Sequence, residues 1–486
     1  MIEERIQFDS KKIIITLICA AIIVFFWFLT PTEPLTAIGM KVIGSFIGVI
    51  LLLSLVDTVW PAILGLVLLS STGVANLNAV IAGSLGNWIV YFVMLSFIMA
   101  YALEESGFTG RLVTKFMSMK FVNRGPWIFM FSVGALGMIL STFMDQIAVI
   151  VFMMPFVKKI YKELGCEKGE MYPSTLNIIT IFSCLIGGIM TPISHSLVIL
   201  PLGIYEAATG NTINLFTYTL FGVPTGLVLF VVMALLIRIV ARPEFDKFKG
   251  FDVQKVLDKQ EKMTLKELLV VIIFFFTAFM WMLPGVLTII APQSEFVKTF
   301  SSYGITFWAI ISVSLMAVLT VNKKPLVNLK DAVNKINWSM MLFLSISLYL
   351  ASAISAESTG VNAFVAKLIE PVTQSFEPMI IVFIVSAAAM LLTNFSSNIS
   401  TTTIFATLVV TVAGAVAAIP APALLMVTTF GCNLSFTAPS GSTPLAILHG
   451  DEYSISREIY KCGIVSLLAA IIIVTFVGYY IATSLV

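Results

Sequence analysis

The segments Phe143-Met144-Asp145-Gln146-Ile147 and Phe395-Ser396-Ser397-Asn398-Ile399 lie about 250 residues apart and read as copies of each other. Each places acidic, amide or hydroxyl side chains in the middle of a long apolar stretch. Polar groups in such surroundings cost free energy and are usually retained for function. The two segments therefore predict a duplicated membrane protein that moves a solute.

The composition places the chain in a membrane. Of its 486 residues, 59% are apolar and 11% are charged, whereas about a quarter of the residues of a soluble protein are charged. The apolar runs have the length of helices and lack the short alternating pattern of an outer-membrane barrel. We therefore expect an all-α, multi-pass protein of the plasma (inner) membrane.

Several other classes of function are disfavoured. The five cysteines are scattered without a CxxC pair, and the chain has only two histidines, so we expect no disulfide framework, no metal site and no other cofactor. The sequence has no HExxH or GxSxG motif and no acidic cluster, so an enzyme is not expected. The net charge of +2 gives no indication of a nucleic-acid partner.

The apolar runs predict eleven membrane spans and two further hydrophobic regions. These two regions, 126–157 and 378–415, are interpreted as re-entrant helical hairpins, because their legs are shorter than the roughly 20 residues of a straight span. The spans are expected at 12–30, 35–56, 59–74, 85–104, 174–203, 212–241, 266–290, 303–322, 338–356, 421–448 and 461–484.

The basic residues predict the orientation. With a cytoplasmic amino terminus, 25 of the 28 Lys and Arg residues fall on the cytoplasmic side, and only Lys41, Lys298 and Lys367 lie outside. This is the bias of the positive-inside rule, and it requires both hairpins to return to their own side. The first hairpin then starts from the cytoplasm and the second from outside, which predicts two inverted repeats.

Two segments with charges unsuited to a span are expected to be interfacial connector helices. They are Gly107 to Val122 and Ser358 to Glu370, and each immediately precedes a hairpin. The loop from Arg242 to Lys266 carries charges of both signs and is interpreted as a solvated cytoplasmic linker between the repeats.

An apolar span interrupted by proline and small polar residues follows each hairpin. The first interruption includes Thr191 to Ser196 and the second Thr437 to Pro444. Proline removes a backbone donor and clashes with the preceding turn, so both helices should break near the middle of the bilayer. Irregular backbone at that depth is tolerated only where it lines a cavity or packs within protein.

The hairpin tips and helix breaks predict one binding site. Exposed helix N-termini carry partial positive charge and free amide donors, which suit a carboxylate. Two tips and two breaks could hold a molecule with two anionic ends. The expected site residues are Ser141, Asp145, Gln146, Ile147, Ser194, His195, Ser196, Thr393, Ser397, Asn398, Ile399, Pro439, Gly441, Ser442, Thr443 and Pro444.

On these features the chain resembles the divalent anion/sodium symporter family, in particular its bacterial sodium-independent dicarboxylate exchangers. Each hairpin tip of that family carries a Ser-Asn-Thr motif. Here Ser397-Asn398 keeps the first two positions of the second motif, Ile399 replaces its threonine, and Asp145-Gln146-Ile147 stands in place of the first. Thr191-Pro192 and Thr443-Pro444 retain part of the pattern of the broken helices.

The resemblance covers the whole length and implies a homodimer that carries C4 to C5 dicarboxylates, such as succinate, malate, fumarate or 2-oxoglutarate, by an elevator mechanism. Residues 1–125 and 211–377, with the linker 242–266, would form a scaffold. Residues 126–210 and 378–486 would form a transport domain that slides against it. Because threonine is missing from both tips, we expect an exchanger that is independent of sodium.

Asp145 and His195 fall on two elements that hold a sodium ion in symporters of that family. We hypothesise that an ion pair between them replaces the cation. The alternative for His195 is a buried, hydrogen-bonded histidine without a role in transport. The alternative functions are a sodium- or proton-coupled dicarboxylate or citrate symporter, with Asp145 as cation ligand or proton carrier, and an anion channel. A channel is disfavoured because its filter normally repeats in one orientation.

Overall fold

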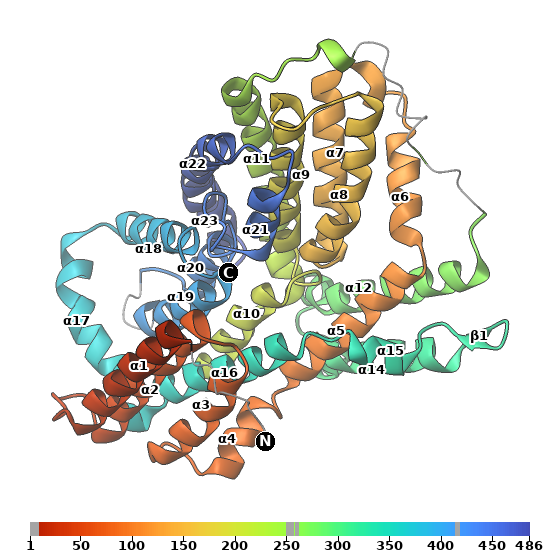
Figure 1. Ribbon diagram of the computed structural model, residues 1–486. Coiled ribbons are helices and arrows are strands. Elements are labelled where there is room, and N and C mark those ends of the chain that lie inside the picture. Colours follow the sequence, from red (N-terminus) through yellow and green to blue (C-terminus); the bar gives the residue numbers. More distant parts are fainter. Residues whose placement is uncertain (1–8, 249–256, 258–261, 414–417) are drawn as a thin grey trace, which may run out of the picture.

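The computed structural model describes residues 9–248, 257, 262–413 and 418–486, and this part of the chain is almost entirely helical (Figure 1). The helices up to the predicted linker are α1 (Ser10–Phe28), α2 (Ala37–Leu55), α3 (Trp60–Ser71), α4 (Leu77–Ser84), α5 (Trp88–Glu105), α6 (Phe108–Met117), α7 (Pro126–Phe143), α8 (Gln146–Glu163), α9 (Met171–Met190), α10 (Ser196–Thr209) and α11 (Leu215–Ala241). Short 3-10 turns, η1 (Val122–Arg124) and η2 (Asp246–Phe248), follow α6 and α11.

The remaining part has a similar make-up. It contains α12 (Leu265–Ile290), α13 (Glu295–Ser302), α14 (Gly304–Val318), α15 (Leu329–Asn334), α16 (Trp338–Ser355), α17 (Val361–Ser375), α18 (Pro378–Thr393), α19 (Asn398–Ala413), α20 (Ala421–Gly431), α21 (Thr443–Gly450), α22 (Ser456–Ile472) and α23 (Tyr479–Thr483). Its other elements are the antiparallel strands β1 (Thr320–Val321) and β2 (Lys324–Pro325), the turn η4 (Glu357–Thr359) and the π-helical turn η5 (Ile473–Gly478).

The helical membrane architecture expected from the composition is confirmed. By length and composition, nine segments within the described ranges can cross a membrane, and ten if α13 and α14, which meet at a bend of 62°, are one span. The expected span at 59–74 is α3, which has only 12 residues. The total of eleven spans therefore stays a prediction.

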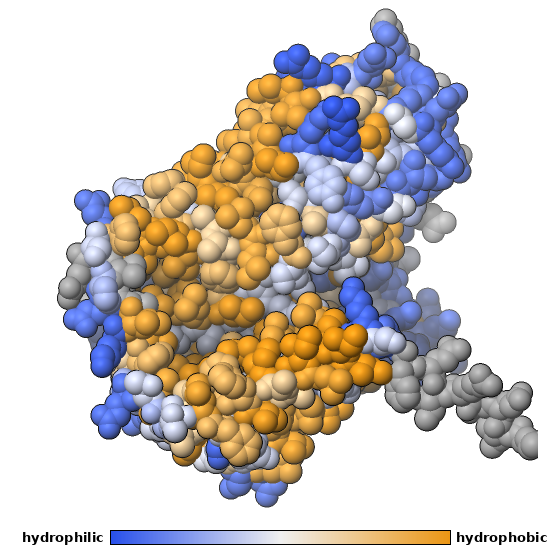
Figure 2. Space-filling view, turned by 60° about the vertical axis from the view of Figure 1, so that its left-hand side comes forward, coloured by the Kyte–Doolittle hydropathy of each residue, from blue (hydrophilic) through white to orange (hydrophobic). Residues whose placement is uncertain are grey.

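The burial of the helices fits a protein surrounded by lipid. The apolar part of α9 is completely buried, whereas only 11% of that of α1 is buried. Figure 2 shows hydrophobic side chains over much of one face, with hydrophilic ones gathered toward its edges. Such a large exposed apolar surface is a membrane-contacting surface.

The two expected hairpins are present, and each begins at a proline. Pro126 and Pro378 lie in the first turn of α7 and α18, where a missing backbone N–H leaves no hydrogen bond unmade. Helix α7 is by itself long enough to cross a membrane, but α8 turns back along it. In Figure 1, α7 and α8 reach the middle of the molecule from the top, and α18 and α19 from the left. The end of the second hairpin, 414–417, lies outside the described residues.

The first helix break occurs where it was expected, whereas the second covers 432–442 and so begins before Thr437, with Thr443-Pro444 in the first turn of α21. Thr191 ends α9 and His195 precedes α10, both with extended backbone. In the second repeat, the chain leaves the helical conformation between α20 and α21. The prolines and small polar residues thus interrupt the two spans in corresponding places.

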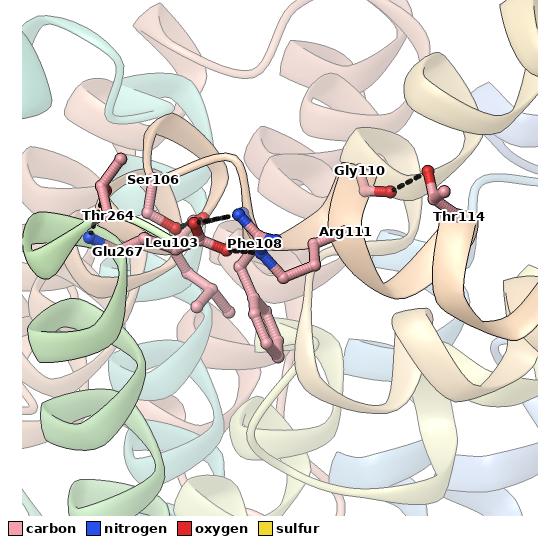
Figure 3. Close-up of polar contacts among 8 residues, drawn as sticks. All are labelled: Leu103, Ser106, Phe108, Gly110, Arg111, Thr114, Thr264 and Glu267. Carbon is pink, nitrogen blue, oxygen red and sulfur yellow. Dashed lines mark hydrogen bonds and ion pairs between the residues drawn. The ribbon is translucent and has the colours of Figure 1, made fainter. Parts of the chain in front are cut away.

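Helices also occupy the positions of the two expected connectors, as α6 and α17. Figure 3 shows Arg111 of α6 reaching across to Glu267 in the first turn of α12. Arg111 donates to both carboxylate oxygens of Glu267, with Nη2 at 2.8 Å from Oε2, and the Glu267 side chain is only 3% exposed. Thr264 caps the same turn by accepting the Glu267 backbone N–H. The connector before the first hairpin is therefore held to α12 by a two-point ion pair.

A polar network joins the first hairpin to the end of the second repeat. Lys158 Nζ on α8 lies 2.7 Å from Asp451 Oδ2, and Asn177 Nδ2 on α9 donates to Asp451 Oδ1 at 3.0 Å. Tyr161 donates its hydroxyl proton to Asn177 Oδ1 at 2.6 Å. The network links α8 and α9 to the loop after α21, although these segments are far apart in the sequence. The division into scaffold and transport domain remains a prediction.

Candidate functional site

The two hairpin tips and the two helix breaks meet around one open cavity with about 780 Å³ of empty space. Both repeats contribute to its lining, the first with four residues and the second with ten. The expected site residues in this lining are Gln146, Ile147, His195, Ser397, Asn398, Ile399, Pro439, Gly441, Ser442, Thr443 and Pro444, and Leu197, Ser440 and Ala446 complete it.

Four helices begin at this cavity. Helix α8 begins at Gln146, α10 at Ser196, α19 at Asn398 and α21 at Thr443. The first residues of a helix have backbone N–H groups without intrahelical partners, and the helix dipole makes that end partly positive. The cavity is therefore surrounded by four partly positive helix ends, two from each repeat.

The side chains around the cavity add no negative charge. Among the described residues that line it, none is acidic, and His195 is the one titratable group. Hydroxyl and amide groups from Ser397, Asn398, Ser442 and Thr443 supply polar contacts. Such a lining favours an anion over a cation.

At the first tip, Asp145 and His195 lie side by side. Asp145 accepts the Ile147 backbone N–H through Oδ1 at 2.9 Å, which caps α8. Its other oxygen, Oδ2, lies 3.7 Å from His195 Nδ1, within ion-pair range but too long for a hydrogen bond. Gln146 contacts the opposite ring nitrogen, with 3.3 Å between its Nε2 and His195 Nε2.

Asp145 does not line the main cavity. With Ser194, His195 and Ser196 it faces a second cavity, much narrower than the first, whose other wall includes Phe92 of α5 and Trp281 of α12. His195 lines both cavities. Ser141 is buried on α7 and lines neither of the two.

At the second tip, side chains hold the hairpin against the helix break. Thr393 shares its one hydroxyl proton between Asn398 Oδ1, at 2.6 Å, and the Cys432 carbonyl. Asn398 donates from Nδ2 to the Asn433 carbonyl at 3.3 Å and from its backbone N–H to the Gly441 carbonyl at 3.0 Å. Thr393 is fully buried, so its place is behind the cavity wall.

Asn394 is a structural residue of the tip that the expected set of site residues lacks. It is fully buried, and its Oδ1 accepts the backbone N–H groups of Phe436 and Thr437 at 2.7 and 3.0 Å. Its Nδ2 donates to the carbonyls of Met390 and Leu434. An amide directly after Thr393 in an apolar helix was the available signal, but its partners lie about 40 residues further along the chain.

The chain is similar to known transporters over most of its length. The family model described as "Citrate transporter" matches residues 49–431. The sodium-dependent dicarboxylate transporter SdcS of Staphylococcus saprophyticus is 27% identical over 444 residues, which is 86% of this chain and 81% of that protein. SdcS of Staphylococcus aureus strain NCTC 8325 is 23% identical over 412 residues, which is 82% of this chain and 77% of that protein.

A solved structure shows the same fold. The crystal structure of the YdaH transporter of Alcanivorax borkumensis superimposes with a TM-score of 0.56 and covers 97% of this chain and 98% of that one. At 12% sequence identity, the likeness concerns the fold alone.

Proposed function

This chain belongs to the citrate transporter family, and we propose that it carries C4 to C5 dicarboxylates, exchanging one dianion for another without sodium. The family match and the similar SdcS proteins confirm the expected family at the level of citrate and dicarboxylate transporters. A family of transporters also agrees with the expectation that the chain is not an enzyme. Succinate, malate, fumarate and 2-oxoglutarate are the proposed substrates.

The observation that carries the proposal is the cavity bounded by four helix N-termini. The starts of α8 and α10 can receive one carboxylate and those of α19 and α21 the other, which gives each anionic end its own pair of partly positive helix ends. The described lining itself holds no acidic group, and the carboxylate of Asp145, which caps α8, is separated from it by His195.

Exchange follows from the cost of moving an unoccupied site. Unpaired backbone N–H groups are expensive in the apolar barrier, because no water is there to bond them. A bound dianion accepts these hydrogen bonds and neutralises the helix ends. The loaded site therefore crosses more readily than the empty one, which couples the exit of one dicarboxylate to the entry of another.

Independence from sodium is supported by the hydrogen bonds that side chains donate to backbone carbonyls at the hairpin tips and helix breaks. A sodium ion needs several oxygen ligands, and broken helices supply them from carbonyls that have lost their helical partners. Here side chains already donate to such carbonyls, as Thr191 does to Thr142, Ser194 to Gly188, Thr393 to Cys432 and Asn398 to Asn433. The Asp145 and His195 pair adds a cationic side chain at the first tip whenever the imidazole is protonated.

An elevator movement of a homodimer is the proposed mode of transport. The contacts of Lys158 and Asn177 with Asp451 support grouping 126–210 with 378–486 as one mobile body. Both carboxylate-binding ends of the site would then travel together past the scaffold helices.

A sodium-coupled dicarboxylate symporter is the second candidate. The similar SdcS proteins are named sodium-dependent. In addition, several buried side-chain oxygens on α19, α20 and the break that follows have no hydrogen-bond partner, namely Thr401 Oγ1, Thr402 Oγ1, Thr429 Oγ1 and Asn433 Oδ1. Hydroxyl and amide oxygens are ligands that a hard cation accepts.

Thermal unfolding of the purified protein in sodium-free buffer tests the substrate class. Succinate should raise the unfolding temperature in a concentration-dependent manner, because a ligand that binds only the folded state stabilises it. Butyrate, with the same carbon chain and one carboxylate, should have little effect. Equal stabilisation by both compounds, or by neither, contradicts the proposal of a dianion site.

A further inference from the structure

A third cavity, with about 1440 Å³ of empty space, lies apart from the dicarboxylate site. Residues of α5, α10, α11, α12 and α14 form its walls together with the bend between α13 and α14. It shares Ile199 and Trp281 with the cavity at Asp145. In the orientation predicted from the basic residues, this end of the helices faces the outside.

This cavity contains an acidic side chain, whereas the dicarboxylate site is bordered by partly positive helix ends. Glu206 of α10 lines it, and no Lys, Arg or His is among the described residues of its wall. The carboxylate is half-buried and shares the cavity wall with the neutral indole of Trp88. No cationic side chain of the described wall pairs with this carboxylate, so the cavity disfavours the dicarboxylates proposed for the main site.

Aromatic side chains surround the carboxylate. Trp88, Trp281 and Tyr303 all line the cavity. Trp281 is fixed in place, because its indole N–H donates to the Ile305 carbonyl at 3.0 Å and its ring packs edge-on against Phe92. Aromatic faces attract cations and provide apolar contact area at the same time.

We propose that this cavity binds an amphipathic organic cation, an aryl- or alkylammonium compound. Its charged group lies against Glu206, and its apolar part lies against the rings of Trp88, Trp281 and Tyr303. The volume is in excess of what an inorganic cation requires, and the three aromatic faces offer contact area for an apolar group. A buried, unpartnered hydroxyl at Thr306 in the same wall provides a further polar contact.

Such a ligand would touch two helices that meet at the proposed transport site. Glu206 is on α10, which begins directly after His195, whereas Trp281 is on α12. The binding itself does not depend on which solute the protein carries, so it can be tested without a transport assay.

Calorimetric titration of the purified protein with benzyltrimethylammonium tests the proposal. The wild type should bind this cation and should not bind phenylmethanesulfonate, which has the same ring and the opposite charge. Glu206→Gln should weaken binding of the cation by about tenfold, since it removes the ionic partner and leaves the rings in place. Glu295→Gln is the matched control, because Glu295 is exposed on nearby α13 and does not line the cavity.

A second variant keeps the charge and removes a ring. Trp88→Leu should weaken binding of the cation by about threefold to tenfold, and it decides the question if Glu206→Gln fails to fold. Equal binding of the cation and the sulfonate to the wild type would show an unselective apolar cavity and overturn the proposal. An unchanged dissociation constant in Glu206→Gln, or the absence of cation binding to the wild type, would overturn it as well.

Discussion

The imidazole of His195 lies against the carboxylate of Asp145, with 3.7 Å between Nδ1 and Oδ2, at the point where the first hairpin tip meets the first helix break. Gln146 Nε2 lies 3.3 Å from the other ring nitrogen. With the amide donating to Nε2, the proton of the neutral ring is on Nδ1, on the side of Asp145. His195 thus stands between a negative charge and the proposed anion site.

Removal of the imidazole should expose the dicarboxylate to the charge of Asp145. We expect His195→Gln to raise the dissociation constant for succinate by about tenfold, because the Asp145 carboxylate is left without the imidazole that separates it from the anion site. The double variant Asp145→Asn with His195→Gln should recover most of the affinity. His449→Gln is the control, since His449 lines neither the main cavity nor that at Asp145. Wild-type affinity in His195→Gln would rule out this role.

Asn394 should be essential for the second tip. In Asn394→Ala, the buried N–H groups of Phe436 and Thr437 lose the oxygen that accepts them. We expect the free energy of unfolding to fall by about 2–4 kcal/mol, measured by denaturant titration. Asn362→Ala is the control, because Asn362 is exposed and makes one long contact of 3.4 Å with Ser355. Similar stabilities of the two variants would contradict this account of the tip.

Gly187 allows α9 to pack closely against α7. A Cβ atom at this position would lie 2.1 Å from the Met138 carbonyl oxygen, and backbone cannot move aside as a flexible side chain can. Gly187→Ala should therefore reduce stability by about 1–3 kcal/mol. Gly110→Ala should be tolerated, because the nearest atom to its Cβ would be 3.8 Å away in Phe152. The two variants can be compared by their unfolding temperatures, and a stable Gly187→Ala would mean that the helices are less closely packed.

The pair of Glu170 and Lys247 should make a small, pH-dependent contribution to stability. Lys247 donates to Glu170 Oε1 at 2.5 Å, and this hydrogen bond lowers the pKa of Glu170 below its ordinary value. A lowered pKa in the folded state stabilises the protein above the pKa of the unfolded chain, and the gain disappears as the pH falls through the folded value. The contribution at neutral pH should be small, because the pair is partly exposed and screened by solvent.

Glu170→Gln measures this contribution. Its unfolding temperature should lie below that of the wild type at pH 7, and the two should converge as the pH falls through the lowered pKa of Glu170. Glu167→Gln, three residues earlier, should follow the wild type throughout. A difference that persists in acid would assign the effect of Glu170 to packing.

The hairpins and helix breaks could be predicted because their signals are local. Pro126 and Pro378 start helices, and Thr191-Pro192 interrupts one, through steric rules that act within a single turn of chain. The pairing of the two tips in one cavity also followed from the internal repeat. By contrast, the sequence analysis predicted neither the shortness of α3 nor the bend between α13 and α14.

The details of the site depend on contacts between distant segments. Asp145 faces a neighbouring cavity shared with Phe92 and Trp281, and no feature of the hairpin alone indicates that direction. The role of Asn394 likewise comes from carbonyl and amide groups of the segment 434–437. Nearly every residue has the same backbone N–H and C=O groups, so the sequence does not indicate which of them form contacts. Such contacts are seen only in the folded chain.

Counterflow in proteoliposomes tests the central claim most directly. Vesicles that contain the purified protein are loaded with unlabelled succinate, and labelled succinate is added outside in sodium-free buffer. Sodium-independent exchange predicts rapid uptake of label that requires internal succinate and is unchanged by an inward sodium gradient. Uptake into vesicles without internal dicarboxylate that depends on the sodium gradient would contradict the claim and favour the symporter.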